Sequence, residues 1–409
     1  MRVLMLGWEF PPYISGGLGT ACYGLTRAME NLDLDIVMLL PANTQGVDSK
    51  TADSLTIKQS GDNLSHVIFQ TVPYTLPNPY QRMRPVRVIG TGQAGGYDGN
   101  LVERVYEYAQ RCLEIVKVKN FDVIHAHDWV TFPAAVALAA EMQKPLIVHI
   151  HATEYDRSGE YINDEVCEIE RQGIQAASAV IAVSHFTAGI LADLYGVPCD
   201  KIRVVYNGID QRQIVPRVYN RRREATVLFM GRITYQKGPE FFVRAAEEVL
   251  KKSSNVRFVM AGWGDLAPEI IEMVAARKLG TKIHFTGFLR GDQVDNAYRM
   301  SDLYVMPSVS EPFGLTALEA IQYRLPVILS KTAGVGEVLR DGALKIDFWD
   351  VNKMADQIVS VLKNPTLAEN LCTNALNEIR NLTWDAAARK CLSVYNEVSR
   401  QFELVGQNN

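Results

Sequence analysis

The sequence has few cysteines, and none of the spacings at which cysteines usually bind metal. Six single cysteines are spread over 409 residues, which also argues against a small disulfide-linked secreted protein. Long apolar runs are missing too, because the apolar start at residues 1–6 is interrupted at once by Gly7-Trp8-Glu9. We therefore expect a cytoplasmic protein with reduced cysteines, without a signal peptide and without a membrane span.

An excess of positive charge is also absent. The chain has 42 Lys and Arg against 46 Asp and Glu, a formal net charge of −4. A protein that binds nucleic acid or an anionic membrane usually carries a basic footprint, so we expect neither partner. With 409 residues, of which 47% are hydrophobic, the chain is too long for one ordinary core and predicts two domains.

What the chain has in abundance is an alternation of apolar strand-like runs and amphipathic helical runs. This alternation predicts an α/β fold with doubly wound parallel sheets, whose ligands bind beyond the carboxyl ends of the strands. In the first half the predicted strands are 36–40, 67–72, 123–126, 146–150, 180–183 and 204–206, after a first strand near the N-terminus, and the predicted helices include 101–119, 132–141 and 165–177.

A second α/β pattern begins at Thr226, after a polar, proline-containing stretch that reads as a linker. We predict a first domain over residues 1–210, completed by a C-terminal helix at about 385–409, and a second domain over residues 211–384. The predicted strands of the second domain are 227–230, 256–261, 283–286 and 326–330, and its predicted helices include 239–252, 351–363 and 367–381.

The most informative stretch is Glu311-Pro312-Phe313-Gly314-Leu315-Thr316, which continues to Glu319. Together with the apolar run Ser301–Met306 before it, the stretch predicts a strand, a loop and a helix, with Glu311 on the loop and Glu319 inside the helix. The N–H groups of Gly314, Leu315 and Thr316 at the helix start would favour a phosphate, with one carboxylate on each side of it. Carboxylates accept hydrogen bonds from sugar hydroxyls, so the stretch suits a nucleotide sugar. A solvated pair of helix acids remains the alternative.

Two further loops predict contacts with a diphosphate. Arg232 and Lys237 follow a strand, where Arg can hold two oxygens and Lys can act as a point charge. Gly16-Gly17-Leu18-Gly19 begins a helix near the N-terminus, where neighbouring glycines let backbone amides approach a diphosphate. A dinucleotide-binding site is the first alternative, but it would need a third glycine and a loop directly after the strand. The second alternative is that the glycines only form a structural turn.

Four of the seven histidines form two H-x-H pairs at strand ends, His125/His127 and His149/His151. Residues i and i+2 share one face of a strand, so a metal site has to be weighed. Against it, partner acids and further histidines do not recur at later strand ends in the same pattern, and we predict no metal. The single Asp-x-Asp sequence, Asp33-Leu34-Asp35, falls between a helix and a strand, away from the edge where a ligand would bind.

Taken in order, these motifs resemble retaining glycosyltransferases of the GT-B fold, in particular glycosyltransferase family four and the related glycogen and starch synthases. The resemblance covers nearly the whole chain. It implies two Rossmann-like domains with a central cleft and a C-terminal helix that crosses back to the first domain near Trp384. It also implies that the first domain holds the acceptor and the second a nucleotide diphosphate sugar, the donor substrate, with no separate cofactor.

The resemblance further assigns residues. His151 would reach the transferred sugar, Gly16, Gly17 and Leu18 would face the donor phosphates, and Gly262 with Phe288 and Leu289 would border the nucleoside. The implied reaction transfers a hexosyl group, most simply glucosyl from UDP-glucose or ADP-glucose, with retention and without metal. Glu311, His151, Arg232 and Lys237 would be catalytic, and Glu319 would hold the donor ribose.

Alternatives from the same residues are a sugar-nucleotide epimerase of the same fold and a non-catalytic sugar-nucleotide binder. Gly262 could equally be a tight turn, and His151 a structural histidine. The irregular stretch 73–100, rich in Pro, Gly and Arg, is interpreted as an acceptor-binding loop, with a disordered insert as the alternative.

Overall fold

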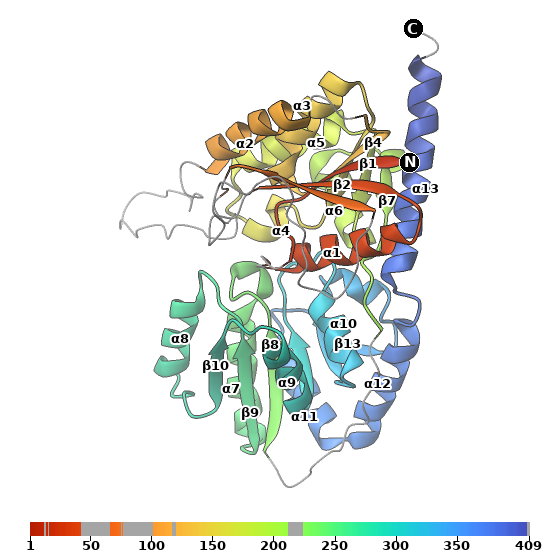
Figure 1. Cartoon of the computed structure of the whole chain (residues 1–409). Coiled ribbons are helices and arrows are strands. Elements are labelled where there is room, and N and C mark those ends of the chain that lie inside the picture. The colour runs from red at the N-terminus through yellow and green to blue at the C-terminus, as the bar shows by residue number, and fades with distance from the viewer. Residues whose placement is uncertain are drawn as a thin grey trace, which may run out of the picture. The chain divides into compact units, whose positions relative to one another are not determined.

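The chain folds into two compact units in a computed structural model that describes residues 1–11, 14, 16–41, 66–74, 76, 101–116, 120–211 and 224–406. The first unit comprises Met1–Tyr155, Glu160–Asp210 and Leu382–Asn409, and the second comprises Asp156–Gly159 and Gln211–Asn381. Most of the stretch 73–100, which we interpret as an acceptor loop, lies outside the described residues, and so does most of the predicted linker, residues 212–223. Each unit is built on one parallel sheet (Figure 1).

The sheet of the first unit has seven strands in the order β3-β2-β1-β4-β5-β6-β7, and every pairing is parallel. The strands are β1 (Arg2–Leu6), β2 (Asp35–Pro41), β3 (Val67–Val72), β4 (Val123–His127), β5 (Leu146–Ile150), β6 (Ala179–Ala182) and β7 (Ile202–Val204). All residues of β4, β5 and β6 are buried, as expected for parallel strands with helices on both faces.

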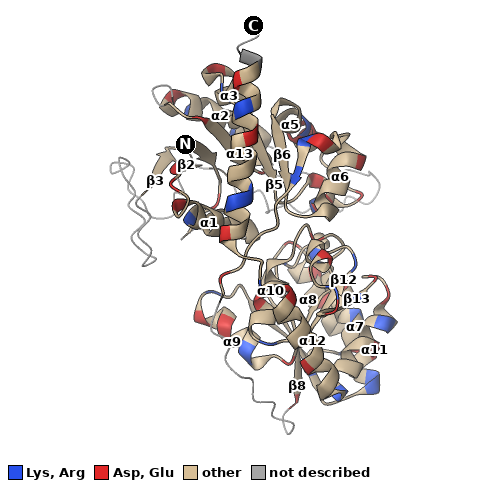
Figure 2. Cartoon of the chain, turned by 90° about the vertical axis from the view of Figure 1, so that its right-hand side faces the viewer, with Lys and Arg blue, Asp and Glu red and all other residues tan. Residues whose placement is uncertain are grey.

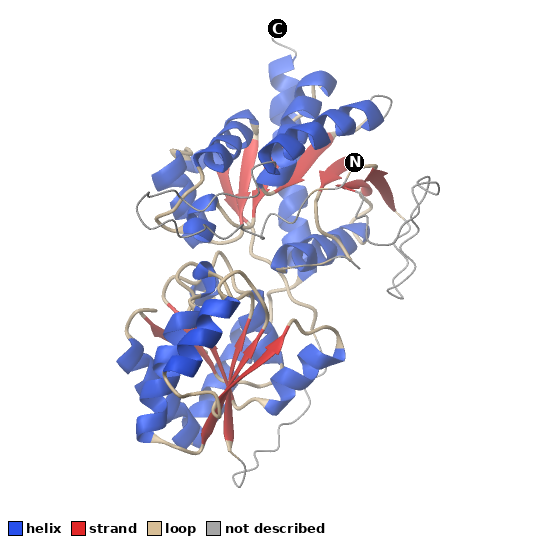
Figure 3. Ribbon diagram, turned by 90° about the vertical axis from the view of Figure 1, so that its left-hand side faces the viewer, coloured by secondary structure: helices blue, strands red, loops and turns tan. Residues whose placement is uncertain are grey.

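Helices cover both faces of this sheet, as Figure 3 shows for each unit. They are α1 (Gly17–Glu30), α2 (Leu101–Val116), α3 (Phe132–Met142), α4 (Glu154–Ser158), α5 (Asp164–Ala176), α6 (His185–Tyr195) and α13 (Trp384–Gly406). The start of α5 is fixed by Asn163, whose side chain accepts hydrogen bonds from the N–H groups of Glu165 and Val166. The helix α4 is divided between the two units, because the segment Asp156–Gly159 belongs to the second unit.

The second unit has a six-stranded parallel sheet in the order β10-β9-β8-β11-β12-β13. Its strands are β8 (Ala225–Met230), β9 (Val256–Ala261), β10 (Ile283–Gly287), β11 (Leu303–Met306), β12 (Val327–Ser330) and β13 (Ala343–Ile346). Its helices are α7 (Pro239–Lys252), α8 (Ala267–Ala276), α9 (Asp292–Met300), α10 (Leu315–Gln322), α11 (Val351–Lys363) and α12 (Pro365–Glu378).

The C-terminal helix α13 belongs to the first unit, against α1. A Cβ on Gly24 of α1 would lie 2.2 Å from the Trp384 indole, and one on Gly208 would lie 2.2 Å from the Trp384 backbone nitrogen. The two glycines therefore make room for Trp384, which is 6% exposed. The expected return of the last helix to the first domain at Trp384 is confirmed.

The predicted strands match the observed ones closely, with one shift. The run predicted as a strand at 204–206 is observed as β7 at Ile202–Val204, after a 3₁₀ turn at Cys199–Lys201. The Val205 N–H still donates to the Ala182 carbonyl, so the apolar run continues the pairing beyond the strand proper. The α/β class with two Rossmann-like sheets is confirmed.

Charged residues of both signs occur on the face shown in Figure 2, where blue and red alternate along α13. This mixture agrees with the small net charge of −4. Within the described part of the chain, we find no helix with the length and apolar character needed to span a bilayer.

Candidate functional site

In the second unit, the residues predicted to bind a donor gather at one edge of the sheet. The chain starts this sheet at β8 and adds β9 and β10 on one side, then β11 on the other, so the strand order reverses between β8 and β11. Ligands of open α/β sheets bind outside the carboxyl ends of the strands at such a switch point. The predicted residues on loops that leave these carboxyl ends are Arg232, Lys237, Gly262, Phe288, Leu289, Glu311 and Gly314.

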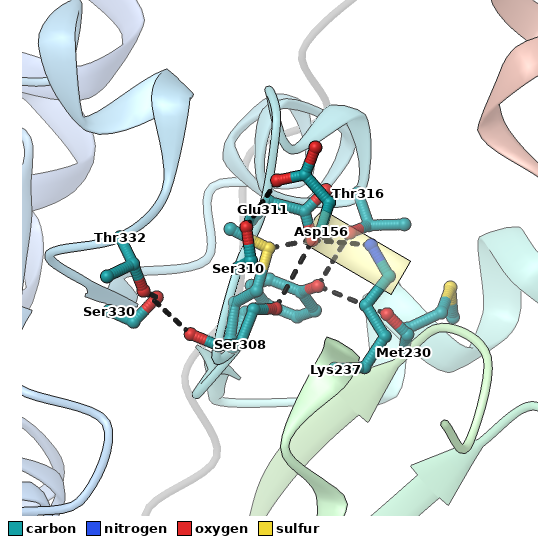
Figure 4. A network of polar contacts seen from close by, with 11 residues as sticks. Asp156, Met230, Lys237, Ser308, Ser310, Glu311, Thr316, Ser330 and Thr332 are labelled. Carbon is teal, nitrogen blue, oxygen red and sulfur yellow. Dashed lines mark hydrogen bonds and ion pairs between the residues drawn. The ribbon is translucent and has the colours of Figure 1, made fainter. Parts of the chain in front are cut away.

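Glu311 is fixed by its backbone and lies in a polar network (Figure 4). Its N–H donates to the Thr332 carbonyl at 3.0 Å, and its carbonyl accepts from the Gly334 N–H at 2.8 Å, so the loop after β12 holds it on both sides. The carboxylate accepts from Lys237 Nζ at 2.5 Å and from Ser308 Oγ at 3.2 Å. Because the Glu311 side chain is only 8% exposed, this ion pair is well shielded from water.

Lys237 ends a 3₁₀ turn, Tyr235–Lys237, that follows β8. The next residue, Gly238, has φ +62°, and a Cβ there would lie 2.2 Å from the Pro307 carbonyl oxygen. Only glycine accepts this contact, which brings the loop after β8 against the loop after β11. Arg232 lies half-buried on the same loop, five residues before Lys237.

The helix α10 begins directly after Gly314, which has φ +115°. This left-handed backbone turns the chain from the Glu311 loop into the helix, so that the first helical N–H groups, at Leu315 and Thr316, have no carbonyl of a preceding turn to bond. The Tyr304 hydroxyl donates to the Thr316 hydroxyl at 2.7 Å, which holds the side chain of Thr316 at the helix start. An anion is favoured at such a helix start.

Glu319 is not a freely solvated helix residue. It is half-buried, and its carboxylate accepts a hydrogen bond from the Tyr298 hydroxyl at 2.8 Å. Tyr298 is fully buried between α9 and α10, and burial raises its pKa well above the usual value, so it stays a donor. Its ring stacks on Tyr323 with centroids 5.2 Å apart. The carboxylate therefore has a defined direction.

The loops after β9 and β10 are tied to the loop after β8. The Gly262 N–H donates to the Gly287 carbonyl at 2.9 Å. Gly262 has φ +135°, and a Cβ there would lie 1.9 Å from the Gly231 carbonyl oxygen, so close approach of two backbones requires this glycine. Phe288 is half exposed beneath the Arg290 guanidinium, 5.4 Å from the ring centroid, and Leu289 is partly buried beside it.

The segment Asp156–Gly159, which groups with the second unit, also reaches this network. The Ser310 hydroxyl donates to the Asp156 carboxylate at 2.5 Å, next to Glu311 in the chain (Figure 4). A Cβ on Gly159, which has φ +58°, would lie 2.4 Å from the Tyr235 ring. Nothing in the sequence indicated this contact, because Asp156 and Ser310 are 154 positions apart.

In the first unit, the strand order reverses between β1 and β4. The loop after β1 carries Gly16, which is half-buried, and Gly17, which is exposed at the start of α1. The Leu18 side chain is 4% exposed, so a ligand could meet only its backbone. The Gly19 N–H donates to the buried Glu9 carboxylate at 3.3 Å, so a carboxylate of the chain itself already lies at this helix start.

The two H-x-H pairs lie side by side on β4 and at the end of β5. Because His127 pairs with His149 in the parallel register, all four rings share one face of the sheet. His127 Nδ1 and His151 Nε2 are 2.9 Å apart. Burial lowers the pKa of His127 to about 3 and lowers the pKa values of the other three well below their usual value, so the rings are neutral near pH 7.

Asp33 and Asp35, the Asp-x-Asp pair, lie before and at the first residue of β2. They are therefore at the amino edge of the sheet, opposite the edge that carries the glycine loop and the histidines. This is the position expected from the sequence, and it separates the pair from the candidate site of this unit.

Sequence reasoning thus found the loops but missed several partners. Tyr298, Tyr304, Ser308 and Asp156 each contact a predicted site residue or its neighbour, and no motif marks them. The only available signal was that Tyr304 and Ser308 flank the carboxyl end of the strand before Glu311. Tyr298 carries no signal, because the packing of α9 against α10 is a tertiary feature.

Comparisons with known proteins find matches along nearly the whole chain. Residues 15–213 match the family model described as Glycosyltransferase Family 4, and residues 211–378 match Glycosyl transferases group 1. An uncharacterized glycosyltransferase of Methanocaldococcus jannaschii is 30% identical, over 97% of this chain and 98% of that protein.

Two further proteins are similar along nearly their whole length. A glycogen synthase of Mycobacterium tuberculosis is 26% identical, over 98% of this chain and 95% of that protein. Among solved structures, sucrose-phosphate synthase from Thermosynechococcus elongatus has a TM-score of 0.78 at 18% identity, covering 97% of this chain and 98% of that one. The latter likeness concerns the fold alone.

Proposed function

Because this chain belongs to glycosyltransferase family four and has the GT-B fold, we propose that it transfers a hexosyl group with retention from a nucleotide diphosphate sugar to a hydroxyl acceptor. The hexose we propose is glucose, and the acceptor class is a saccharide, as in a glucan synthase. The likeness to a glycogen synthase over 98% of the chain supports this choice of substrates.

The ion pair between Lys237 and Glu311 beside the start of α10 is the observation that supports the proposal best. A shielded cation and carboxylate 2.5 Å apart hold each other in place without a ligand. When a donor binds, Lys237 turns to the diphosphate, and Glu311 accepts hydrogen bonds from hydroxyls of the hexose. Substrate groups then replace the internal partner of each residue, so neither charge is left buried and unpaired.

The leaving nucleotide diphosphate develops negative charge that must be stabilised. We assign this role to Arg232, Lys237 and the N–H groups of Leu315 and Thr316, because preorganised donors in a shielded site stabilise developing charge strongly. Glu319 holds the ribose hydroxyls. Gly262, Phe288 and Leu289 border the nucleoside, with Phe288 offering an exposed ring face.

The transfer follows same-face substitution, in which the departing phosphate helps to remove the proton of the acceptor hydroxyl. A double displacement would need a carboxylate nucleophile, and Glu311 is engaged with sugar hydroxyls in our scheme. From the first unit, His151 contributes a neutral imidazole that can donate or accept a hydrogen bond but carries no charge. Gly16, Gly17 and the Leu18 backbone contribute amides for phosphate, and no metal enters this scheme.

Two alternative functions would require the same nucleotide-sugar site. A sugar-nucleotide epimerase of this fold would release free nucleotide from the donor alone, and a non-catalytic binder would bind donor without turnover. The position of Asp33 and Asp35 at the far sheet edge supports transfer without an Asp-x-Asp metal.

The test is a thermal-shift screen of UDP-, ADP- and GDP-sugars, followed by acceptor profiling with the donor that binds. Proton NMR of the product gives the anomeric configuration. We expect one nucleoside diphosphate glucose to raise the melting temperature and an α-linked product from that α-configured donor. A β-linked product contradicts retention, and nucleotide release without any acceptor favours the epimerase.

A further inference from the structure

Four histidines of the first unit form a cluster, and the transfer scheme uses only one of them, His151. His125 and His127 lie on β4, and His149 lies on β5, whose end leads to His151. The ring centroids of His125 and His127 are 4.4 Å apart, and those of His149 and His151 are 4.3 Å apart. The His125 and His149 rings are parallel within 6° at 5.4 Å. Three of the rings, at His125, His127 and His149, are at most 2% exposed.

Only some of the ring nitrogens in this cluster form hydrogen bonds. His125 Nδ1 lies 2.7 Å from the Tyr395 hydroxyl, and His127 Nδ1 lies 2.9 Å from His151 Nε2. His125 Nε2, His127 Nε2 and both nitrogens of His149 are buried and have no hydrogen-bond partner among the described residues. Burying a polar atom without a partner is unfavourable, so four such atoms in one cluster call for a ligand.

Nitrogens of the three buried rings also converge. One nitrogen from each of His125, His127 and His149 can be chosen so that all three lie within 4.8 Å of one another. Tetrahedral zinc with Zn–N bonds of about 2.0–2.1 Å needs nitrogens roughly 3.3 Å apart, so small ring rotations would close the set. Imidazole nitrogen favours zinc and its transition-metal neighbours over magnesium or calcium.

We propose that His125, His127 and His149 bind one divalent transition-metal ion of the zinc class, with a water molecule as fourth ligand. Coordination through Nε2 of His125 and His127 places the ring protons on Nδ1. His125 then donates to the Tyr395 oxygen, and His127 donates to His151 Nε2. These are the outer hydrogen bonds that metal-binding histidines usually make. The buried Asp128 carboxylate, which accepts a hydrogen bond from the His151 N–H at 2.7 Å, supplies a negative charge beside the cluster.

This inference departs from our expectation from the sequence, which predicted no metal because partners for each H-x-H pair did not recur further along the chain. The register of β4 with β5 removes that objection, because each pair is the partner of the other. The ion takes no part in the transfer proposed above. Its effect on that site is indirect: by fixing the His127 tautomer, it fixes the hydrogen bond that orients His151.

Metal content tests the proposal without any activity assay. The full-length protein, with its purification tag removed, is loaded with Zn²⁺, passed over a desalting column and analysed by inductively coupled plasma mass spectrometry. We expect about one zinc per chain, and a stoichiometry near zero for His149→Leu, which fills the position with an apolar side chain and removes both ring nitrogens. His284→Ala, an exposed histidine on β10, is the matched control and should bind like wild type.

If His149→Leu does not fold, two further measurements, on wild type and on a milder variant, still test the proposal. X-ray absorption of the zinc form should show three imidazole nitrogens and one further light ligand at about 2.0–2.1 Å. Tyr395→Phe, which removes only the outer acceptor, should weaken zinc affinity about 10–100-fold. Wild type that retains no zinc after loading, or a zinc shell without imidazole, overturns the proposal and leaves water as the ligand of the cluster.

Discussion

At the scale of single residues, the two acids of the α10 region have different surroundings. Glu311 is pinned through its backbone and pairs with Lys237, whereas Glu319 meets the Tyr298 hydroxyl on the helix. A carboxylate beside the reacting carbon affects mainly the rate, because a misplacement of about 1 Å can cost roughly 100-fold. A carboxylate on the ribose contributes equally in ground and transition states, and therefore affects mainly KM.

Glu311→Gln should therefore lower kcat about 100-fold with little change in donor KM, and Glu319→Gln should do the reverse. Steady-state kinetics with varied donor check both variants. Glu369, on α12, forms an ion pair with Arg324 at the surface. Glu369→Gln is therefore the control and should leave kcat and KM unchanged. Equal losses of kcat in both variants would contradict the assigned roles, and an unaffected Glu311→Gln would refute the transfer scheme.

Arg232→Ala and Lys237→Ala should each reduce kcat/KM by about 100-fold, because each removes about 3 kcal/mol of stabilisation from the leaving diphosphate. The same kinetic assay measures this, and thermal unfolding shows whether the variants stay folded. Lys331→Ala is the matched control, since its ion pair with Asp347 is on the surface of the same unit. Near-normal turnover in either variant removes that residue from the mechanism.

Tyr298 is a positioning residue for Glu319, and its hydroxyl can be removed without changing the ring. Tyr298→Phe should raise the donor KM about fivefold with kcat almost unchanged, since the lost hydrogen bond is worth about 1 kcal/mol. Tyr323→Phe keeps the ring stack and loses a hydroxyl that bonds to Asp295 instead, so it is the control. A fall in kcat for Tyr298→Phe, or an equal KM effect in both variants, would argue for a merely structural role.

At the scale of elements, α13 is held to the first unit by Trp384. The indole fills the space left by Gly24 on α1, and the backbone of the same residue lies against Gly208. A large buried side chain with a close-fitting surround leaves a cavity when it is truncated, because neighbouring backbone atoms relax only in part.

Trp384→Ala should lower the free energy of unfolding of the first unit by about 3–5 kcal/mol. Thermal or urea unfolding followed by circular dichroism measures the change. Trp349→Ala is the matched control, because Trp349 is 61% exposed in the second unit. If both variants melt alike, α13 contributes little to the stability of the fold.

At the scale of the whole molecule, we expect turnover to survive EDTA in the assay, and Mn²⁺ or Mg²⁺ to add nothing. The reason is that, in the proposed scheme, Arg232, Lys237 and helix amides would supply the charge stabilisation that a metal supplies elsewhere. Initial rates taken directly after chelator addition report only on rapidly exchanging metal ions. An ion bound in the buried histidine cluster would therefore not affect the measurement. Loss of turnover that Mn²⁺ or Mg²⁺ restores would overturn the prediction.

How much of the site the sequence reveals depends on the distance between partners along the chain. Lys237 and Arg232, or Glu311 and Gly314, lie on one loop, and the strand before each loop gives its position. The contact of Glu319 with Tyr298 and that of Ser310 with Asp156 join different elements, so no pattern in the sequence indicates either contact.

The sequence by itself determined the elements, because apolar runs and helical periodicity are local, and buried parallel strands must be apolar on both faces. It also determined the family, since the loop motifs occur in a fixed order. The order of strands, the register of β4 with β5 and the contact of Lys237 with Glu311 were decided only by tertiary structure. These depend on which surfaces pack together, and local preferences do not specify that. The histidine cluster is the clearest case, because two separate pairs in the sequence become one cluster in the fold.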